Sequence, residues 1–414
     1  MDAILRGTFH ALPSKSRLHR LLISAALGRN EVTLPCSLLS RDTEATVCSL
    51  NALGAEIAWD GNSLRVKPIV KVPGHALLPC GESASTLRFL LPVAAALGSE
   101  AEFQCEGKLA SRPMEGLLNA LSAHGAAVRR ENGSFFCVGQ LTPGVFAIPG
   151  NVSSQFVSGL LFALPLLGGD SEIRLTSELQ SAPYVEMTLS ALREAGIKVR
   201  KTAAGWQLPG GQRYALPALC RPEGDWSDAA FFLAAGALAG KVTVSGLDPD
   251  SLQGDRQIAD YLKNAGARIT FAEDGITAEK SGSPLQPFTA DLRQTPDLAP
   301  VLAVLAAAAR GTSHLSGCER LRDKESDRAE ALRRLICDLG GSASLEGGCL
   351  TVCGRGRLKG GSARSFGDHR IAMAAALCGL ISDAPVSVDD PGCVGKSHPG
   401  FFDDLNSLKR EVSA

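Results

Sequence analysis

Apolar runs, each introduced by a short polar segment, recur along this chain. The stretch from Ser14 to Gly28 shows the pattern: a polar, basic front is followed by an apolar run that ends at glycine. Serine before such a run and glycine after it are typical helix start and stop signals. Lys15 and Arg20 lie near the positive end of the helix dipole, which is unfavourable unless an anion binds there. The stretch therefore predicts a helix with an anion-binding start and a buried tail.

The same plan occurs five more times, at intervals of about 70 residues. The later runs end at Gly98, Gly168, Gly240, Gly311 and Gly379. A period of this length is longer than that of the common solenoid repeats. Each copy is therefore expected to be a small module of several helices and strands.

A second element repeats out of phase with the first. Each copy reads as an amphipathic helix, a glycine, a strand, a polar turn and another strand, and the glycines are Gly54, Gly125, Gly196, Gly266 and Gly340. Only five complete copies accompany six apolar runs. The missing copy is expected to be assembled from residues 386–388 and 3–9, which would close one domain through both chain ends.

Length and repeats together predict an α/β protein of two domains. A chain of 414 residues is too long for one ordinary core. Two sets of three modules then give one domain over residues 13–222 and a discontinuous one over residues 1–12 and 223–414. Loops that contain proline, near residues 12–13 and 216–224, mark the two places where the chain is expected to pass from one domain to the other. The polar helix starts are expected to line the space between the domains.

Composition narrows the function classes. The net charge is −1, so nothing favours nucleic acid or a membrane as a partner. The N-terminus lacks a signal-peptide pattern, and the longest uncharged run is interrupted by prolines and amides. The 12 cysteines have irregular spacings, which favours reduced thiols in a cytoplasmic protein. No metal-ligand spacing, GxGxxG motif or P-loop occurs, so no metal or cofactor is expected.

The densest charge cluster spans residues 320–328. If it is helical, Arg320, Lys324 and Arg328 fall on one face, and Glu319, Asp323 and Asp327 form a matching acidic stripe. Such clusters are usually exposed helices, but like charges four residues apart are mildly unfavourable. We therefore expect a ligand between Lys324 and Arg328, with Glu325 available for proton transfer.

Other candidate ligands are weaker when taken alone. Arg112 precedes a proline and is expected to be extended, Lys396 lies between Gly and Pro, and Ser181 lies in a turn. Cations and hydroxyl donors dominate the candidates, while Asp297 and Glu325 are the only acid/base candidates among them. Arginine forks suit carboxylates and phosphates. The residues thus predict a site that binds two anionic small molecules and moves protons between them.

Ten motifs in this order resemble the EPSP synthase family of enolpyruvyl transferases, over nearly the whole chain. They are Ser14-Lys15-Ser16 with His19-Arg20, residues 83–89, Arg112-Pro113, Ser153-Ser154-Gln155, Ser181 with Pro183-Tyr184, residues 223–225, Pro296-Asp297, residues 324–328, residues 367–370 with Ala372-Met373, and Lys396-Ser397. The resemblance implies a two-domain inside-out α/β barrel, each domain made of three βαβαββ repeats. It also implies a cytoplasmic enzyme, expected to be a monomer, with its site in the cleft between the domains.

The resemblance further implies a reaction and roles for residues. The enolpyruvyl group of phosphoenolpyruvate would pass to the 5-hydroxyl of 3-phosphoshikimate through a tetrahedral intermediate, in the shikimate pathway to chorismate and the aromatic amino acids. Catalytic residues would be Asp297 as base, Glu325 as acid, Lys15 and His369. The 3-phosphoshikimate ligands would be Lys15, Ser16, Arg20, Ser153, Ser154, Gln155, Ser181, Asp297 and Lys324. The phosphoenolpyruvate ligands would be Lys15, Ala84, Arg112, Gln155, Arg328, Arg370 and Lys396.

Three positions depart from the family pattern. Ala84 replaces a glycine that faces phosphoenolpyruvate in many members, and its methyl group is expected to reduce sensitivity to the inhibitor glyphosate. Arg320 stands where some members carry an Asn that contacts the shikimate phosphate. Glu82, often Asn in the family, adds a charge to the loop before Ala84.

Two alternative functions remain. UDP-N-acetylglucosamine enolpyruvyl transferase shares the fold, but typically carries a reactive Cys five positions before an Arg-Pro pair. Gly107 occupies that position here, and the nearest thiol is Cys105. A non-catalytic homologue that only binds anions is the other alternative, although every expected acid, base and cation is present.

Overall fold

The computed structural model describes residues 4–410, which divide into two compact units. One unit is Pro13–Pro222, and the other combines the residues up to Leu12 with those from Glu223 onward. Each unit has its own continuous hydrophobic core. The chain passes between the units at Leu12–Pro13 and at Pro222–Glu223, in the proline-bearing loops noted in the sequence.

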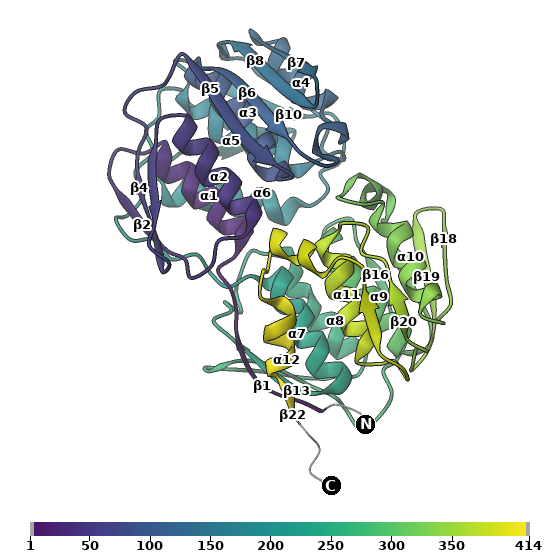
Figure 1. Ribbon diagram of the computed structural model, residues 1–414. Helices are drawn as coiled ribbons and strands as arrows, with labels where there is room; N and C mark the ends of the chain where they lie inside the picture. The colour runs from purple at the N-terminus through teal and green to yellow at the C-terminus, as the bar shows by residue number, and fades with distance from the viewer. Residues whose placement is uncertain (1–3, 411–414) are drawn as a thin grey trace. The chain divides into compact units, whose positions relative to one another are not determined.

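Three small sheets form the outside of the Pro13–Pro222 unit (Figure 1). The first has the order β2 (Val32–Pro35), β4 (Ser63–Lys67), β3 (Glu56–Trp59). The second has the order β5 (His75–Gly81), β6 (Glu100–Cys105), β8 (Ser134–Gly139), β7 (Ala126–Glu131). The third has the order β9 (Val145–Ile148), β10 (Ser171–Leu175), β12 (Gly205–Leu208), β11 (Arg200–Lys201). In the second and third sheets the first two strands are parallel and the rest antiparallel.

The first sheet completes the same pattern with a distant segment. The amide of Thr33 in β2 donates to the Ala218 carbonyl at 2.8 Å, and the Cys220 amide donates back to the Thr33 carbonyl at 3.1 Å. This bridge is parallel. The chain just before the second crossing thus occupies the place that β5 and β9 hold in the other two sheets.

Three helices of this unit are buried inside the sheets. They are α1 (Lys15–Ala26), α3 (Ala84–Leu97) and α5 (Ser154–Ala163). Three further helices bury one face only: α2 (Arg41–Ala52), α4 (Glu115–Ser122) and α6 (Ala182–Glu194). Strand residues alternate between buried and exposed, as in β5, because one sheet face packs on the helices and the other meets water. Short 3-10 turns η1 (Leu109–Ser111) and η2 (Leu164–Leu166) complete the unit.

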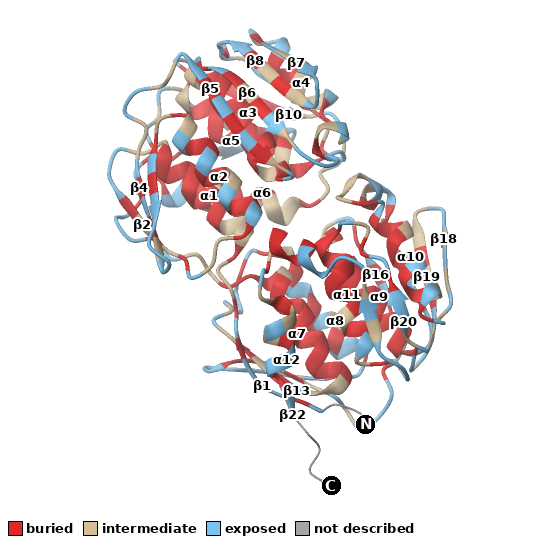
Figure 2. Ribbon diagram, in the orientation of Figure 1, coloured by how far each residue is buried: buried red, intermediate tan, exposed pale blue. Residues whose placement is uncertain are grey.

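The second unit repeats this arrangement with helices inside and sheets outside. Its first sheet has the order β14 (Arg268–Ala272), β15 (Gly275–Glu279), β13 (Gly240–Ser245), β1 (Ile4–His10), β22 (Lys409–Arg410). The second has the order β16 (Thr289–Asp291), β17 (Arg310–Ser316), β19 (Cys349–Arg355), β18 (Ala343–Glu346). The third pairs β20 (Gly361–Ala363) with β21 (Val386–Val388). The inner helices are α7 (Trp226–Ala239), α9 (Ala299–Ala308) and α11 (His369–Gly379). Figure 2 shows α7 and α11 buried along most of their length. The others are α8 (Ile258–Asn264), α10 (Arg328–Asp338) and α12 (Phe401–Ser407), with 3-10 turns η3 (Gly254–Gln257), η4 (Pro296–Leu298), η5 (Glu319–Asp323) and η6 (Pro391–Lys396).

The glycines of the second repeated element are helix terminators, as predicted. Each follows an outer helix and has a φ between 77° and 102°, the left-handed region that favours glycine: Gly54, Gly125, Gly196, Gly266 and Gly340.

The glycines of the first set behave differently, and the prediction that all of them stop helices is wrong. Of the six, Gly98 alone is a left-handed C-cap, with a φ of 72°. Gly240 begins β13, where a side chain would overlap the Leu5 backbone of β1. Gly311 lies in β17 against Pro287. Close packing explains the glycine at both positions, and Gly240 is in addition the C-cap of α7.

The predicted origin of the missing copy is also wrong. Residues 4–10 form β1, which pairs in parallel with β13 and so supplies the first strand of that repeat. Residues 386–388 form β21, which pairs with β20. The C-terminal partner of β1 is β22, through Ile4–Arg410 and Leu5–Lys409. Both ends of the chain do close this unit, although by different residues, and residue 3 of the expected strand lies outside the described residues.

Candidate functional site

Polar side chains gather at the starts of the inner helices in each unit. In the Pro13–Pro222 unit, Ser14 caps α1 and its side chain accepts from the Arg17 amide. Lys15 Nζ lies 2.8 Å from Asp42 Oδ2 on α2, and the Lys15 side chain is 20% exposed. Asp42 was not predicted from the sequence. A short ion pair of this kind holds the lysine side chain in place while part of that side chain stays exposed.

Two other basic residues of α1 lie deeper than predicted. Burial lowers the pKa of His19 to about 3, so this side chain is neutral, and its Nδ1 lies 2.7 Å from Thr46 Oγ1. Arg20 is buried, and burial lowers its pKa to about 9. His19 therefore cannot contribute a positive charge to anion binding at neutral pH.

Arg20 uses its guanidinium within the protein. It donates to Thr188 Oγ1 at 2.8 Å and to the carbonyls of Ser16 and Tyr184 at 2.6 and 2.7 Å. These bonds fasten the first turn of α1 to α6. Binding of 3-phosphoshikimate by Arg20 stays a prediction.

The starts of α3 and α5 are joined by one arginine that the family pattern did not assign to substrate. Arg88 donates to Gln155 Oε1 at 2.9 Å, to Ser153 Oγ at 3.3 Å and to the Pro113 carbonyl at 2.9 Å. The Gln155 amide donates to Ser85 Oγ at 2.9 Å. The expected ligands Ser153 and Gln155 are thereby brought together and their rotamers fixed, and Ser154 follows as the first residue of α5.

Arg112 and Ser181 show features typical of ligand-binding residues. Arg112 is extended, as predicted, with φ −71° and ψ 149°, and its buried Nε has no hydrogen-bond partner among residues 4–410. Ser181 is buried at the start of α6 with a φ of 56°. A non-glycine residue in this conformation stores strain, which is common at binding sites.

The loop before α3 contains two of the departures from the family pattern. Ala84 is the first residue of α3 and is buried. The Glu82 side chain lies over Gly107, whose φ is 54°, so that any side chain at position 107 would overlap Glu82. A reactive Cys at this position, as in the UDP-N-acetylglucosamine enzymes, would be strained and would displace Glu82.

Three cations converge on one carboxylate in the other unit. Lys324 Nζ and Arg328 Nη1 lie 3.1 and 3.0 Å from Asp297 Oδ1, and Arg370 Nη2 lies 3.4 Å from Asp297 Oδ2. Burial alone would raise the pKa of Asp297, but Arg370, Lys324 and Arg328 outweigh it and hold the pKa well below its usual range. Asp297 is therefore ionised at neutral pH.

Arg328 organises the rest of this cluster from a fully buried position. It donates to Asp368 Oδ2 at 2.9 Å and to Glu325 Oε2 at 2.8 Å. Glu325 Oε1 lies 3.8 Å from Lys396 Nζ. Asp368 also caps α11, where His369 is the first residue and is buried. All the expected ligands of this unit thus lie on connected residues, and Asp368 is an addition.

Residues 320–328 do not form the single helix that was considered for this charge cluster. Residues 319–323 form the 3-10 turn η5, Lys324 is extended, and α10 begins only at Arg328 after its cap, Asp327. Asp327 accepts the Glu330 amide, and Ser326 donates to Asp368, so local side-chain bonds interrupt the helix. There is no acidic stripe, yet Lys324 and Arg328 still meet, because both reach Asp297.

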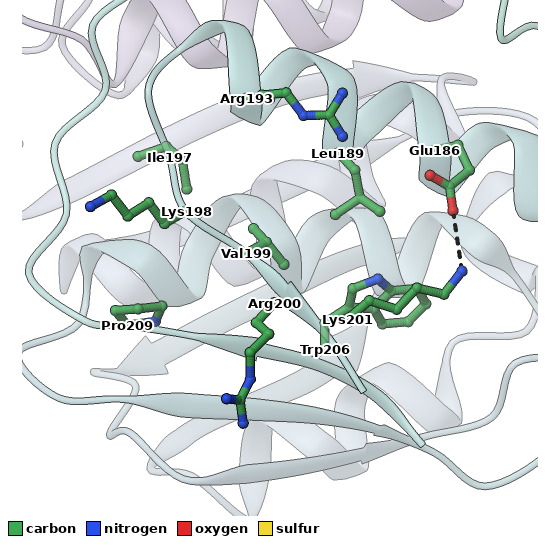
Figure 3. A pocket seen from close by; sticks show the side chains of 10 residues that line it. All are labelled: Glu186, Leu189, Arg193, Ile197, Lys198, Val199, Arg200, Lys201, Trp206 and Pro209. Atoms are coloured by element: carbon green, nitrogen blue, oxygen red, sulfur yellow. Dashed lines mark ion pairs between the residues drawn. The ribbon is translucent and has the colours of Figure 1, made fainter. Parts of the chain in front are cut away.

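A separate groove in the Pro13–Pro222 unit contains none of the predicted site residues. It has a volume of about 480 Å³ between α6 and the β11–β12 hairpin. Figure 3 shows Lys198 and Arg200 pointing away from each other and Lys201 extending to Glu186. A second groove lies at the equivalent place in the first repeat, against β3 and β4. The groove is therefore a by-product of the repeated helix–hairpin packing, and its cations do not converge on a ligand.

Other features of the described chain bear on cofactors and environment. All twelve cysteines are free, and seven are buried. Within residues 4–410, no group of three or more His, Cys, Asp or Glu side chains is placed to hold a metal ion. No helix in the same range is long and apolar enough to cross a bilayer.

Fold and clusters together define a class: an α/β protein of two inside-out barrels, each carrying cations and hydroxyl groups at its inner helix starts. Comparisons agree. A family model described as EPSP synthase (3-phosphoshikimate 1-carboxyvinyltransferase) matches residues 2–405. The 3-phosphoshikimate 1-carboxyvinyltransferase of Methanocorpusculum labreanum is 40% identical over 99% of this chain and 97% of its own. That of Clostridium kluyveri is 40% identical over 99% and 96%.

Solved structures share the fold. EPSP synthase from Acinetobacter baumannii superimposes with a TM-score of 0.80 at 23% identity, covering 99% of this chain and 97% of its own. The enolpyruvyl transferase NikO from Streptomyces tendae gives 0.77 at 19% identity, covering 98% and 96%. The chain belongs to the EPSP synthase (3-phosphoshikimate 1-carboxyvinyltransferase) family of transferases. The predicted two-barrel α/β fold is confirmed.

Proposed function

We propose that this protein transfers the enolpyruvyl group of phosphoenolpyruvate to the 5-hydroxyl of 3-phosphoshikimate and releases phosphate. The observation that carries the proposal is the convergence of Lys324, Arg328 and Arg370 on an ionised Asp297, in a chain of this family. A carboxylate surrounded by cations suits a reaction between two anions. The cations offset the charge of the substrates while the carboxylate takes a proton.

In the proposed mechanism, Asp297 removes the proton of the 5-hydroxyl as its oxygen attacks C2 of phosphoenolpyruvate. Glu325 gives a proton to the methylene carbon, which forms the tetrahedral intermediate. The intermediate then loses phosphate, which takes the proton held by Asp297, and Glu325 takes a proton back from the methyl group. This restores the double bond and the starting state of both carboxyl groups. General acid and base groups of this kind typically contribute about 10²–10⁴-fold each.

The remaining assignments follow the family pattern. 3-Phosphoshikimate would be held by cationic, hydroxyl, amide and carboxylate side chains, namely those of Lys15, Ser16, Arg20, Ser153, Ser154, Gln155, Ser181, Asp297 and Lys324. Phosphoenolpyruvate would be held by Lys15, Ala84, Arg112, Gln155, Arg328, Arg370 and Lys396, with His369 beside it. The buried Nε of Arg112, which has no hydrogen-bond partner within residues 4–410, supports its assignment, because such a donor is costly without a ligand. We also propose a cytoplasmic monomer without nucleic-acid or membrane partners, in keeping with a net charge of −1 and twelve free thiols.

Phosphate release from phosphoenolpyruvate tests the proposal. We expect release to require 3-phosphoshikimate and not to occur with UDP-N-acetylglucosamine. Asp297→Ala and Glu325→Ala should each lower kcat by at least about 100-fold. Glu273→Ala, in an exposed hairpin, is the matched control and should behave as wild type. Turnover with the nucleotide sugar, or full activity of the two variants, would contradict the proposal.

A further inference from the structure

A chain of buried polar side chains, here called the hydroxyl network, joins three helices of the Pro13–Pro222 unit. Its members, in order, are His19 of α1, Thr46 of α2, Thr86 of α3 and Ser83, the cap of α3. His19 Nδ1 lies 2.7 Å from Thr46 Oγ1, which lies 2.6 Å from Thr86 Oγ1. Thr86 Oγ1 in turn donates to Ser83 Oγ at 2.8 Å. All four residues are 1% exposed or less.

The hydroxyl network is costly for its surroundings, which are an apolar core. It leaves His19 Nε2 buried and without a hydrogen-bond partner among residues 4–410. The Phe89 ring lies edge-on to the imidazole, with 6.5 Å between the ring centroids. An unsatisfied buried polar atom costs free energy that an apolar side chain would avoid, whereas a buried hydrogen-bond network fixes the elements that it joins in one arrangement. We therefore looked for what the network holds in place.

The first segment that it contacts carries the partner of Lys15. The hydroxyl oxygens of Thr86 and Thr46 lie 3.4 and 3.5 Å from the carbonyl oxygen of Asp42. The Asp42 side chain pairs with Lys15 Nζ at 2.8 Å. Lys15 also lies four residues before His19 on α1, so the two side chains share one face of the helix. The position of Lys15 thus depends on the network through both of the helices that hold it.

The second segment is the start of α3. Ser83 Oγ accepts the Thr86 amide at 3.3 Å, so Ser83 is both the cap of this helix and the last member of the hydroxyl network. Ala84 follows it directly, where the family pattern places phosphoenolpyruvate. A shift of the Ser83 side chain would therefore move the backbone at Ala84.

We propose that Thr46 and Thr86 are positioning residues for the reaction, which hold Lys15 and the start of α3 in the relative position that phosphoenolpyruvate needs. This inference rests on the proposed function, which assigns phosphoenolpyruvate to Lys15 and Ala84. Neither threonine has to touch the substrate, because the hydroxyl groups act through their neighbours in the network. Loss of one hydroxyl group should therefore weaken substrate binding more than it slows the chemical step, since the proposed acid and base lie in the other unit.

The test compares Thr86→Val, which removes the hydroxyl group and keeps the shape, with Thr86→Ser, which keeps the hydroxyl group. In Thr86→Val, KM for phosphoenolpyruvate at saturating 3-phosphoshikimate should rise about three- to tenfold, with kcat changed less than about twofold. In Thr86→Ser, KM should stay within about twofold of wild type. Ile173→Val is the control for lost packing, because Ile173 is fully buried in β10 and makes no hydrogen bond through its side chain. It should leave KM unchanged.

A double-mutant cycle with Thr46→Val tests whether the two hydroxyl groups act as one unit. Thr46→Val alone should raise KM by a similar factor. The double variant should raise it no further than the larger single change, because either loss breaks the same network. An unchanged KM in the Val variants, effects that multiply in the double variant, or equal impairment of Thr86→Ser and Thr86→Val would overturn the inference. If Thr86→Val does not fold, Thr46→Val against Thr46→Ser decides in the same way.

Acetylation of the Lys15 ammonium group, followed by mass spectrometry, gives a second readout that does not depend on turnover. The rate of labelling should rise about threefold or more in both Val variants, because Lys15 is held less firmly, and should keep the wild-type value in Ile173→Val. Unchanged labelling of Lys15 in the Val variants would overturn the inference. Absence of phosphate release by the wild type would instead refute the proposed function, and the labelling rates would still show whether the network holds Lys15.

Discussion

At the scale of single residues, environment separates basic side chains that look alike in the sequence. Lys15 is 20% exposed beside Asp42, whereas Arg20, five positions later on the same helix, is buried and bonded to two backbone carbonyls. Lys15 is therefore partly accessible, whereas Arg20 holds the helix start in position. Asp297 and Asp255 differ in the same way, because three cations surround the first, whereas one oxygen of the second has no hydrogen-bond partner in the described part of the chain.

Lys15→Met should abolish most activity while leaving the fold intact. The change removes a charge assigned to both substrates, and we expect kcat/KM to fall at least about 100-fold, since a lost charge-assisted bond typically costs about 3 kcal/mol. Ser16→Ala is the comparison and should lose far less. Steady-state kinetics of both variants, with circular dichroism as a check on folding, measures the difference. Equal losses would argue against the role of Lys15.

Ala84→Gly should increase sensitivity to glyphosate. The Ala84 methyl group is buried at the start of α3, where the family pattern places phosphoenolpyruvate and its inhibitor. Removing it frees space, so we expect the inhibition constant to fall by about tenfold or more, with a smaller change in KM for phosphoenolpyruvate. Inhibition of wild type at low micromolar glyphosate, with normal substrate kinetics, would show that the methyl group does not obstruct the inhibitor.

At the scale of elements, the inner helices pack closely against one another, whereas the outer helices bury only one face. Gly159 in α5 packs against α3, where a side chain would overlap the Arg88 carbonyl and Pro92. The same arginine joins the starts of these two helices. The spacing of α3 and α5 therefore determines where Ser153 and Gln155 lie.

Gly159→Ala should destabilise the protein by about 1–3 kcal/mol, because the two helices must move apart. The reduced stability should be accompanied by lower affinity for 3-phosphoshikimate if Gln155 is displaced. Gly168→Ala is the matched control, since nothing lies near a side chain there, and its effect should stay within about 0.5 kcal/mol. Urea unfolding of the full chain gives both values, and equal stability of the two variants would contradict the packing argument.

His398 attaches α12 to α7 through charge. Its ring nitrogens lie 2.9 Å from Asp228 Oδ1 and 2.7 Å from Asp404 Oδ2. Burial alone would lower its pKa, but Asp228 and Asp404 outweigh it and raise the pKa to about 9. A folded-state pKa above the unfolded value gives stability that is complete below about pH 6.5 and is lost as the pH rises through about 9.

We therefore expect the free energy of unfolding to fall by about 2 kcal/mol between pH 6 and pH 9.5, allowing for solvent screening at the half-exposed Asp404. In His398→Gln this decrease should be absent. Denaturant unfolding of both proteins across this range provides the measurement. A parallel decrease in the variant would assign the pH dependence to other groups.

At the scale of the whole molecule, the two units differ in how the chain builds them. The Pro13–Pro222 unit is one continuous segment with its own core. The other unit needs both chain ends, because β1 lies between β13 and β22. Without β1, the backbone of β13 would lose its hydrogen bonds to that strand and would expose unpaired N–H and C=O groups.

A fragment of residues 13–222 should fold alone with a cooperative unfolding transition, while residues 223–414 should fold poorly. Adding a peptide of residues 1–12 should restore the second fragment, since β1 is the missing strand. A Leu5→Asp peptide is the control and should not restore it, because Leu5 is fully buried. Circular dichroism and amide exchange report both outcomes. Cooperative folding of residues 223–414 without the peptide would contradict the central role of β1.

The sequence alone determined the repeated plan, because that plan depends on short-range physics. Apolar runs had to be buried, and glycines after amphipathic helices had to take left-handed φ, as Gly54 and Gly340 do. Serine and aspartate caps also follow local rules, and Ser14 and Asp368 obey them. These features predicted an α/β protein of two domains with three modules each. The resemblance to the family added the barrel, and its motifs pointed to the same residues that gather at the helix starts.

The tertiary structure decided what depends on partners far along the chain. Strand β1 pairs with β13 more than 230 positions away, which no local pattern encodes. The helix expected over residues 320–328 is broken because Ser326 bonds to Asp368 and Lys324 reaches Asp297. Burial likewise decided which cations remain available to a ligand. Local sterics therefore determined the elements, while long-range contacts and burial determined the charges of the candidate site.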